Sequence, residues 1–337
     1  MSSEDPKSTK GAIIKNDAFL DKSLRPDNWA EYIGQETIKN NVKILLNAAS
    51  LRNHPPEHLL FYGPPGLGKT TLAYLIAKEL KTQIKSTSGP AIEKVSDLAS
   101  ILTNLESGDI LFIDEIHRLN KMIEEVLYPA MEQGSLNIII GKGPGARVIQ
   151  LELPPFTLIA ATTRVALLSS PLRSRFSGGT HKLEFYTEND IAQIIERSAK
   201  ILTTKIDGGA IEEIAKRSRY TPRIANQLLK RSRDYAEVKN LALTKQTVEE
   251  ALTMFGIDNL GLSVADRDVL ITLAKKFSGG PVGLNTLATS LMEEEATIED
   301  VYEPYLIQCG LIERTPRGRQ LTPEGYKHLN ILPKKNK

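Results

Sequence analysis

The chain has 337 residues and a mass of 37.3 kDa, room for about two or three domains, and its 41% hydrophobic and 25% charged residues exclude a mainly disordered protein. With 43 Lys and Arg against 41 Asp and Glu, the net charge of +2 by itself predicts no polyanionic partner. The single cysteine, Cys309, excludes an internal disulfide and a zinc site built from cysteines.

Both ends of the chain are polar. Residues 1–23 are predicted to form a flexible N-terminal segment, and residues 333–337 a basic tail. The N-terminal segment lacks the apolar stretch of a signal peptide, and no run approaches the about 18 apolar residues of a membrane-spanning helix. We therefore expect a soluble, cytoplasmic protein with no membrane partner.

Residues 24–186 alternate between short apolar runs and helical patterns. The runs that predict strands are 59–63, 109–114, 156–163 and 181–186. This alternation predicts an α/β domain with a parallel sheet. Residues 187–256 have helical spacing throughout and predict a small helical domain, whereas residues 257–332 predict helices followed by a short hairpin.

The strongest motif is GPPGLGKT, Gly63–Thr70, between a predicted strand and a predicted helix. It matches the phosphate-binding P-loop, in which glycines let backbone N–H groups converge on phosphate oxygens. Lys69 is expected to reach the β and γ phosphates, and the Thr70 hydroxyl to bind magnesium.

A second motif, ILFIDE, ends a buried strand with Asp114 and Glu115. The carboxyl ends of parallel strands form the ligand edge of an α/β sheet. Asp114 is expected to hold magnesium, directly or through water, and Glu115 to orient the attacking water. His117 has no second ligand at metal spacing and is expected to be structural or to make a contact within the site.

The strand FTLIAATTR ends in Thr162 and Thr163, whose hydroxyls could bond the γ-phosphate or the attacking water. Downstream, SPLRSRF supplies Arg173 and Arg175, and TPR supplies Arg223 in the helical domain. Guanidinium groups assist phosphoryl transfer when they reach the γ-phosphate, including from a neighbouring subunit.

These motifs resemble an AAA+ ATPase, and more specifically the RuvB family of bacterial Holliday-junction branch-migration motors. The family-specific segments are LRPDNWAEYIGQ (24–35), DEIHRLNKMIEEVLYPAMEQG (114–134), LPPFTLIAATTR (153–164), TPRIANQLLKRSRDYAEV (221–238) and EPYLIQCGLIERTPRGR (303–319). The resemblance covers about residues 24–332. It implies an AAA+ ATPase domain (24–186), a helical lid (187–256) and a winged-helix DNA-binding head (257–332), with ATP and Mg²⁺ as ligands.

The resemblance also implies roles for individual residues. The catalytic set is Lys69, Asp114, Glu115, Thr163 as sensor 1 (with Thr162 as the alternative), Arg175 as the trans-acting finger and Arg223 as sensor 2. The nucleotide contacts are Leu24, Arg25, Gly66, Gly68, Lys69, Thr70, Thr71, Glu132, Gln133, Gly134, Arg175, Tyr186 and Arg223. Thr70 and Asp114 are the implied magnesium ligands.

A trans-acting finger implies an oligomer, and the family implies a homo-hexameric ring. The segment 133–153 has two β-like arms around GKGPGA, and in the family such a hairpin docks a RuvA-like junction-binding protein. An ordinary edge hairpin of the ATPase domain is the alternative. A RuvC-like resolvase is a further possible partner.

One departure from the family pattern lies beside Arg175. After Phe176 the chain continues SGGTHKLEFY, with one residue more than the family usually has before the next strand. We expect this insertion to shift the reach of Arg175 unless the flexibility of the added glycine absorbs it.

In the head, helix 297–308 carries acidic residues and no base, with Thr297 and Asp300 predicted as a helix cap. Arg314, Arg317 and Arg319 surround the hairpin turn and predict contacts to the phosphates of duplex DNA without sequence preference. We therefore expect an ATP-driven ring motor acting on DNA four-way junctions. A clamp-loader-like switch and a DNA-binding regulator with an inactive ATPase site are the alternatives.

Overall fold

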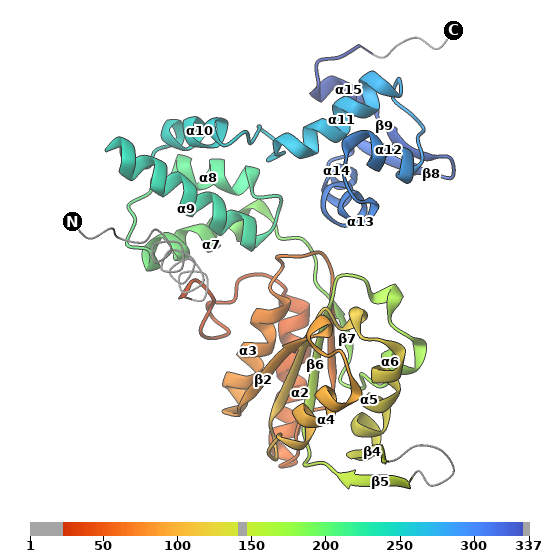
Figure 1. The fold of residues 1–337 in the computed structure, drawn as a ribbon. Helices are drawn as coiled ribbons and strands as arrows, with labels where there is room; N and C mark the ends of the chain where they lie inside the picture. The colour runs from red at the N-terminus through yellow and green to blue at the C-terminus, as the bar shows by residue number, and fades with distance from the viewer. Residues whose placement is uncertain (1–22, 141–146, 333–337) are drawn as a thin grey trace, which may run out of the picture. The chain divides into compact units, whose positions relative to one another are not determined.

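The computed structural model describes residues 23–140 and 147–332 (Figure 1). The predicted N-terminal segment, the basic tail and the predicted hairpin turn at 141–146 lie outside the described residues, apart from Ser23. The chain forms two compact units. Unit 1 comprises Met1–Leu202 and Thr221–Asn226, and unit 2 comprises Thr203–Tyr220 and Gln227–Lys337.

Unit 1 is built on a five-stranded parallel sheet with strand order β2-β3-β6-β1-β7 (Figure 1). The strands are β1 (Leu59–Tyr62), β2 (Ile84–Ser88), β3 (Ile110–Asp114), β6 (Thr157–Thr162) and β7 (Thr180–Lys182). The predicted parallel sheet is confirmed. The strand expected over 181–186 is shorter than predicted, and β2 had not been predicted because the edge segment IKSTS has no apolar run.

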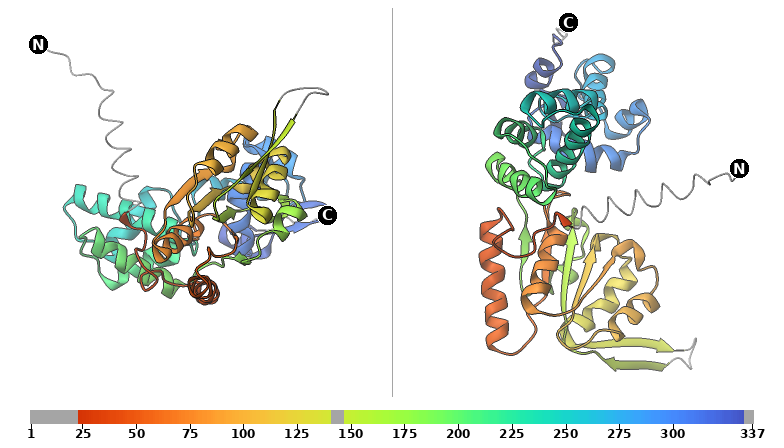
Figure 2. Two further views of the ribbon diagram at one scale, coloured as in Figure 1. Left: turned by 90° about the horizontal axis from the view of Figure 1, so that it is seen from below. Right: turned by 90° about the vertical axis from the view of Figure 1, so that its left-hand side faces the viewer.

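Helices cover both faces of this sheet. Leu60, Leu111 and Leu158 point to one face, where they pack with α4 (Val95–Thr103), α5 (Lys121–Gln133) and α6 (Ser170–Ser174). On the other face lie α2 (Glu36–Leu51) and α3 (Lys69–Leu80), as the right-hand view of Figure 2 shows. Alternate residues of a strand point to opposite faces, and both faces are covered, so the central residues of β1, β3 and β6 are apolar and polar residues stand only at the strand ends.

Shorter elements complete unit 1. The antiparallel strands β4 (Ser135–Ile140) and β5 (Arg147–Glu152) form the expected two-armed hairpin, which extends beyond the five-stranded sheet (Figure 2). The 3₁₀ turns η1 (Gly89–Ala91), η2 (Ile116–Arg118) and η4 (Val165–Leu167) follow β2, β3 and β6. Helix α7 (Glu188–Ile201) begins at a capping box of Thr187 and Asp190.

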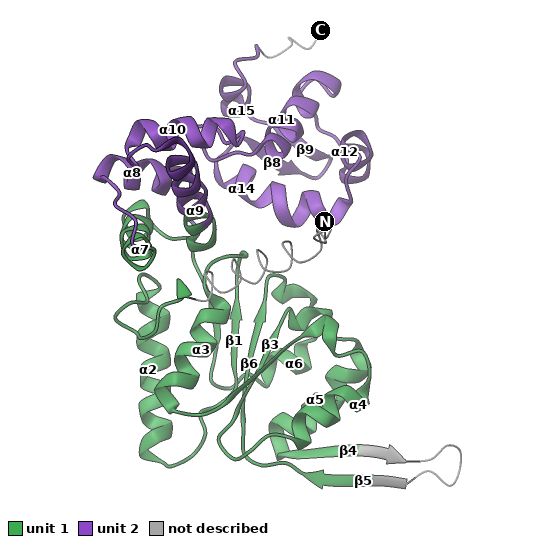
Figure 3. Cartoon of the chain, turned by 60° about the vertical axis from the view of Figure 1, so that its left-hand side comes forward, with its two compact units in different colours: residues 1–202, 221–226 green, residues 203–220, 227–337 purple. Residues whose placement is uncertain are grey.

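The expected helical domain does not form a separate compact unit. Helix α7 and the first turn of α9 (Pro222–Lys239) group with unit 1, whereas α8 (Gly208–Arg217), the rest of α9 and α10 (Lys245–Met254) group with unit 2 (Figure 3). Asp207 caps α8, and Thr244 caps α10, each by accepting a backbone N–H.

The remainder of unit 2 has helices and a two-stranded hairpin, as expected. The elements are α11 (Val264–Lys276), α12 (Leu284–Leu291), α13 (Glu295–Thr297), η5 (Ile298–Tyr302), α14 (Glu303–Gln308), β8 (Ile312–Thr315), β9 (Gly318–Leu321) and α15 (Pro323–His328). Leu270, Leu273, Leu306 and Leu321 lie in its core. The predicted cap at Thr297 is wrong, because the helical segment begins at Glu295 and Thr297 has helical backbone angles with no capping bond.

A buried ion pair joins the α8–α9 loop to α11. The Asp266 carboxylate is fully buried and accepts hydrogen bonds from both terminal nitrogens of Arg219 and from Ser263. Arg219 also donates to Gly261 O at 2.9 Å, and its guanidinium lies 5.1 Å from the centre of the Tyr305 ring. Arg219 thus binds an acid of another segment, whereas Arg217 and Arg233 pair with acids of their own helices.

Removing the Asp266 carboxylate should leave Arg219 as a buried, unpaired charge. We expect Asp266→Ala to lower the free energy of opening of α11 by about 3–5 kcal/mol, measured by hydrogen–deuterium exchange of its amides. Asp268→Ala is the matched control, because Asp268 is exposed on the same helix. Equal protection in the two variants would contradict the role of the ion pair.

Candidate nucleotide site and DNA-contacting hairpin

The loop between β1 and α3 has the backbone of a phosphate-binding loop. Gly66 and Gly68 have φ of 81° and 97°, a conformation that side chains disfavour. A Cβ atom at Gly66 would lie 3.0 Å from Arg223 Cβ, and one at Gly68 would lie 3.0 Å from the Tyr32 hydroxyl. The glycines therefore allow both the turn and the close approach of its neighbours.

Lys69 begins α3 and is buried against this loop. Its Nζ donates to Gly63 O at 2.8 Å and Pro64 O at 2.7 Å. Burial lowers the pKa of Lys69 to about 8; nearby Arg223 also lowers the pKa, and Asp114 opposes the shift. The ammonium is thus held where a phosphate oxygen would stabilise its charged form.

Asp114 and Thr70 lie together at the carboxyl edge of the sheet. Thr70 Oγ1 donates to Asp114 Oδ2 at 3.2 Å, so the structure brings the two predicted magnesium ligands into contact. Glu115 follows with φ of 49°, and its carboxylate is half exposed and 3.4 Å from Arg118 Nη1. Thr71, the next residue of α3, is partly buried.

The two threonines after β6 have different surroundings. Thr162 is 1% exposed, and its Oγ1 lies 2.9 Å from His117 Nδ1. Thr162 Oγ1 also accepts the backbone N–H of Arg164 at 3.0 Å. Thr163 is exposed just beyond the strand. Thr162 therefore has structural partners, whereas the Thr163 side chain is exposed.

Arg223 reaches the P-loop within unit 1. Its backbone N–H donates to Gly66 O at 3.4 Å, and its charge acts on Lys69. Ser198 Oγ donates to Asn226 Oδ1 at 2.7 Å, which ties the first turn of α9 to α7. The sequence motif TPR thus lies beside GPPGLGKT although more than 150 residues separate them.

Three further residues lie where the resemblance places the base of the nucleotide, beside the P-loop. Tyr186 is 5% exposed and donates its hydroxyl to Leu67 O at 3.2 Å, and burial raises its pKa to about 12. Leu24 is buried, while Arg25 is exposed over the Tyr74 ring.

Sequence reasoning missed two residues that hold this region in place. Arg197 donates to Leu24 O at 2.9 Å and Arg25 O at 3.0 Å, and pairs with Glu31 at 2.6 Å. Tyr32 lies against Gly68 and 3.5 Å from the Tyr186 hydroxyl. Only the LRPDNWAEYIGQ segment signalled Tyr32, and no local pattern signalled Arg197.

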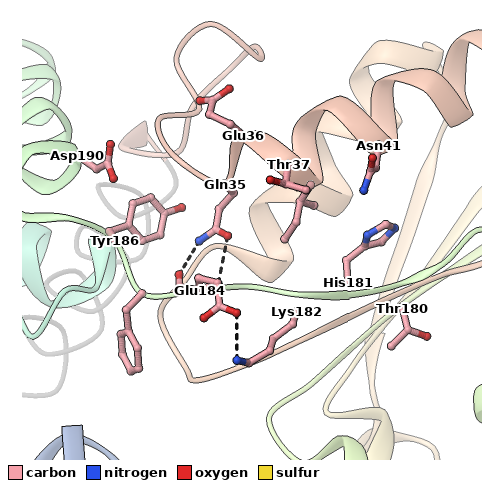
Figure 4. Close-up of a pocket in the computed structure, with 12 residues that line it drawn as sticks. Gln35, Glu36, Thr37, Asn41, Thr180, His181, Lys182, Glu184, Tyr186 and Asp190 are labelled. Atoms are coloured by element: carbon pink, nitrogen blue, oxygen red, sulfur yellow. Dashed lines mark hydrogen bonds and ion pairs between the residues drawn. The ribbon is translucent and has the colours of Figure 1, made fainter.

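A hollow of about 480 Å³ lies between the start of α2 and residues 180–186 (Figure 4). Of the predicted nucleotide contacts, only Tyr186 lines it. Gln35 bridges to the backbone of Glu184 with bonds of 2.6 and 3.2 Å, and Lys182 pairs with Glu184 at 3.0 Å. The Gln35 bridge helps to fix the segment that carries Tyr186.

Arg175 has its contacts on α5 and α6. Its guanidinium is 4.4 Å from the centre of the Tyr128 ring, 3.1 Å from Glu132 Oε2, and donates to Pro171 O at 2.7 Å. Glu132 and Gln133 end α5, and Gly134 is its C-cap. The structure therefore groups Arg175 with Glu132, and shows no contact of Arg175 with the described P-loop residues.

The glycines after Phe176 are held firmly, which corrects the expectation of added flexibility. Gly178 N–H donates to His58 O at 2.9 Å, and Gly179 O accepts from Leu60 N at 3.0 Å. A Cβ at Gly178 would lie 2.7 Å from Glu57 O. Gly178 and Gly179 are thus packed closely against the residues at the start of β1, and the loop that contains them is not slack.

The arginines of the β8–β9 hairpin differ in their surroundings. Arg319 is 8% exposed and forms a two-bond ion pair with Glu303 at 2.7 and 3.0 Å. This buried pair argues against the predicted DNA contact of Arg319, because its guanidinium is already occupied. Arg314 is half exposed and pairs with Glu299, which raises the pKa of Arg314.

Arg317 at the turn is the most available of the three. The Arg317 side chain is exposed, and its backbone N–H donates to Thr315 Oγ1 at 3.3 Å. Two acidic residues before the hairpin, Glu299 and Glu303, therefore bind two of its arginines.

The described residues contain neither a cluster of metal-binding side chains nor a membrane-spanning helix. No group of three or more His, Cys, Asp or Glu side chains in residues 23–140 and 147–332 is arranged to hold a metal ion. None of the described helices combines the length and apolar character needed to cross a membrane.

Three family models match the chain in succession. They are the Holliday junction DNA helicase RuvB P-loop domain over residues 24–183, the RuvB AAA lid domain over 186–258 and the RuvB C-terminal winged helix domain over 259–330.

Individual proteins match over nearly the same extent. The RuvB subunit of the Holliday junction branch migration complex from Fusobacterium nucleatum is 56% identical over 94% of this chain and 95% of its own length. The subunit of the same name from Dehalococcoides mccartyi is 54% identical over 98% of this chain and 95% of its own.

A solved structure shows the same fold. The Thermotoga maritima RuvB Holliday junction branch migration motor is 48% identical, with a TM-score of 0.84 over 92% of this chain and 99% of its own. The fold class is thus a P-loop AAA+ domain followed by a helical lid and a winged helix. The chain belongs to the RuvB family of Holliday-junction branch-migration ATPases.

Proposed function

We propose that this chain hydrolyses ATP at its P-loop and uses the energy to move duplex DNA through four-way junctions as a homo-hexameric ring. The convergence of Lys69, the Thr70–Asp114 pair and Arg223 on one loop carries the proposal. The names of the two relatives, subunits of a Holliday junction branch migration complex, support the DNA substrate. We place the protein in the cytoplasm, where bacterial recombination and repair take place.

Magnesium would be held by Thr70 and Asp114 together with the phosphates. These oxygen ligands suit Mg²⁺, which usually keeps several waters and needs no complete protein cage. When bound, Mg²⁺ neutralises charge on the β and γ phosphates. The Thr70–Asp114 contact supports this assignment, because it places the two oxygens 3.2 Å apart at the sheet edge.

The side chains around the loop divide the remaining work. Lys69 binds the β and γ phosphates, and Glu115 orients the attacking water. Thr163 contacts the water or the γ-phosphate, and Arg223 reaches the nucleotide from the first turn of α9. Leu24, Arg25 and Tyr186 enclose the base. Lys69 and Arg223 hold one nucleotide from two parts of the chain, so hydrolysis can change the angle between them.

The finger is proposed to act between subunits. Arg175 contacts Tyr128, Glu132 and Pro171 of its own chain, and not the P-loop. We infer that Arg175 reaches the γ-phosphate of a neighbouring subunit, with Glu132, Gln133 and Gly134 at the same interface. This arrangement requires a head-to-tail interface between subunits, which we propose to close into the ring of six expected for the family.

The chain is proposed to act in three parts with other proteins. Residues 24–186 hydrolyse ATP, 187–256 form the lid, and 257–332 contact DNA. The 133–153 hairpin is proposed to dock a RuvA-like junction-binding protein, with a RuvC-like resolvase as a further partner. The hairpin's extension beyond the ATPase sheet supports this docking site (Figure 1).

The β8–β9 hairpin is proposed to contact the DNA backbone. Arg317 has an exposed side chain at the turn, and Arg314 is half exposed beside it. Phosphate contacts from such arginines bind DNA without reading its sequence. Arg319 has the different task of bracing the hairpin against α14 through Glu303.

ATP binding should depend on pH through Lys69. Below pH 8 the Lys69 side chain of the ATP-free protein is already charged. Above pH 8 the side chain is neutral and must take up a proton when ATP binds. The Kd for ATP should therefore rise by up to about tenfold per pH unit above pH 8. Calorimetric titration between pH 7 and 9.5 measures this slope and the proton uptake. Lys69→Arg should flatten both, because arginine stays charged. Identical slopes would contradict the assignment.

Subunit mixing tests the trans-acting finger. Arg175→Ala and Glu115→Gln should each abolish ATP hydrolysis in the presence of DNA. An equal mixture should recover activity, because about one interface in four then pairs an intact Arg175 with an intact Glu115 of the neighbour. Steady-state phosphate release measures the recovery. Mixtures that stay inactive at every ratio would show that the finger does not act in trans.

The salt dependence of DNA binding tests the hairpin contact. Arg317→Ala should weaken binding to duplex DNA and reduce the slope of log K against log salt by about 0.9, the loss of one phosphate contact. Lys327→Ala is the control: it removes an exposed positive charge from α15 and should leave the slope unchanged. An unchanged slope for Arg317→Ala would refute the contact.

A further inference from the structure

We propose that Tyr128 is a positioning residue for the arginine finger, and that its ring presents the Arg175 guanidinium to the neighbouring subunit. The proposal rests on the trans role of Arg175 proposed above. It assigns a function to a tyrosine in the middle of α5, which the sequence motifs and the nucleotide site leave without one.

The Tyr128 side chain contacts both ends of α6. Its hydroxyl lies 2.9 Å from Ser169 Oγ, and Ser169 is the N-cap that accepts the backbone N–H of Leu172. Its ring lies 4.4 Å below the guanidinium of Arg175, the C-cap of the same helix. One side chain therefore holds the beginning and the end of the element that carries the finger.

Helix α6 needs such support because it is very short. Five residues, Ser170–Ser174, cannot form a stable helix by themselves. Leu172 and Phe176 anchor the segment in the core, with 0% and 4% exposure. These anchors fix the backbone but leave the direction of the Arg175 side chain undetermined. The Tyr128 ring and Pro171 O supply that direction.

An aromatic ring is suited to holding an arginine that must bind phosphate. The guanidinium has five N–H donors, and a ring below its plane occupies none of them. Arg175 Nε is buried and has no hydrogen-bond partner among the described residues, so at least one donor is unused. Glu132, by contrast, binds Nη2 with a negative charge that a phosphate would have to replace.

The Tyr128 ring can therefore keep its contact with Arg175 while Arg175 binds a γ-phosphate. The Glu132 carboxylate, by contrast, competes with that phosphate for the guanidinium. The Tyr128 hydroxyl is also 3.3 Å from Glu124 Oε2, one turn earlier on α5. With Ser169 and Glu124 as partners, the hydroxyl fixes the orientation of the ring. The Tyr128 ring makes the cation–π contact with Arg175, and the Tyr128 hydroxyl aligns the ring for that contact.

Two substitutions separate the ring from the hydroxyl. Tyr128→Leu removes the cation–π contact and should lower kcat for ATP hydrolysis roughly tenfold, with the KM for ATP nearly unchanged, because a misplaced finger acts only in the transition state. Tyr128→Phe keeps the ring and should retain activity within about threefold of wild type. Equal losses in the two variants would overturn the role of the ring.

Subunit mixing then tells a finger defect from a general loss of structure. The reference is the mixture of Glu115→Gln subunits, which donate the finger, with Arg175→Ala subunits, which hydrolyse ATP. Adding Tyr128→Leu to the finger donor should remove most of the recovered activity. Adding it to the hydrolysing subunit should leave the recovered activity intact.

Each outcome has one meaning. If Tyr128→Leu lowers the recovered ATP hydrolysis equally in the finger-donating and in the hydrolysing subunit, Tyr128 supports the fold in general and the proposal is overturned. If Tyr128→Leu in the finger-donating subunit causes no loss, the proposal is overturned as well. A reference mixture without activity would refute the trans finger itself, and this proposal with it. Circular dichroism and sedimentation of each variant report its folding and its assembly independently of ATP hydrolysis.

Discussion

Parallel pairing of β1, β3 and β6 places the nucleotide-binding side chains at one edge of the sheet. Tyr62 pairs with Thr162, and Ile113 pairs with Ala160, so Gly63, Asp114 and Thr163 all leave the sheet at the same edge. Helices cover both faces of the sheet, so these strands are buried and their central residues are apolar. Polar residues stand only at the strand ends. The phosphate loop, the proposed magnesium ligands and the proposed sensor depend on this register.

Three arginines of unit 2 form internal ion pairs with acidic side chains. Arg217 pairs with Glu213, Arg219 with Asp266, and Arg319 with Glu303; all of these side chains are buried except that of Arg219, which is partly buried. These pairs occupy three arginines that the charge pattern alone would leave available to a polyanion. Of the three hairpin arginines, Arg317 stays exposed at the β8–β9 turn, which suits the proposed contact with DNA.

The sequence was sufficient to predict the parallel sheet, the P-loop and the contact between Thr70 and Asp114, because each depends on local spacing or on strand ends. It was not sufficient for Arg197, whose partners lie more than 160 residues away, nor for β2, which is a polar edge strand. The burial of Arg319 depends on Glu303 across the head, so a one-dimensional charge pattern predicted the wrong surroundings for this arginine.

The central claim is that Arg175, held over Tyr128, completes the ATP site of a neighbouring subunit. The most direct measurement is a cryo-electron microscopy structure of the chain assembled on a four-way junction with a non-hydrolysable ATP analogue. We expect the Arg175 guanidinium within hydrogen-bonding distance of the γ-phosphate held by the neighbouring subunit's Lys69, still stacked on its own Tyr128. An Arg175 directed away from every γ-phosphate in the ring, or one that has left the tyrosine, would contradict the account.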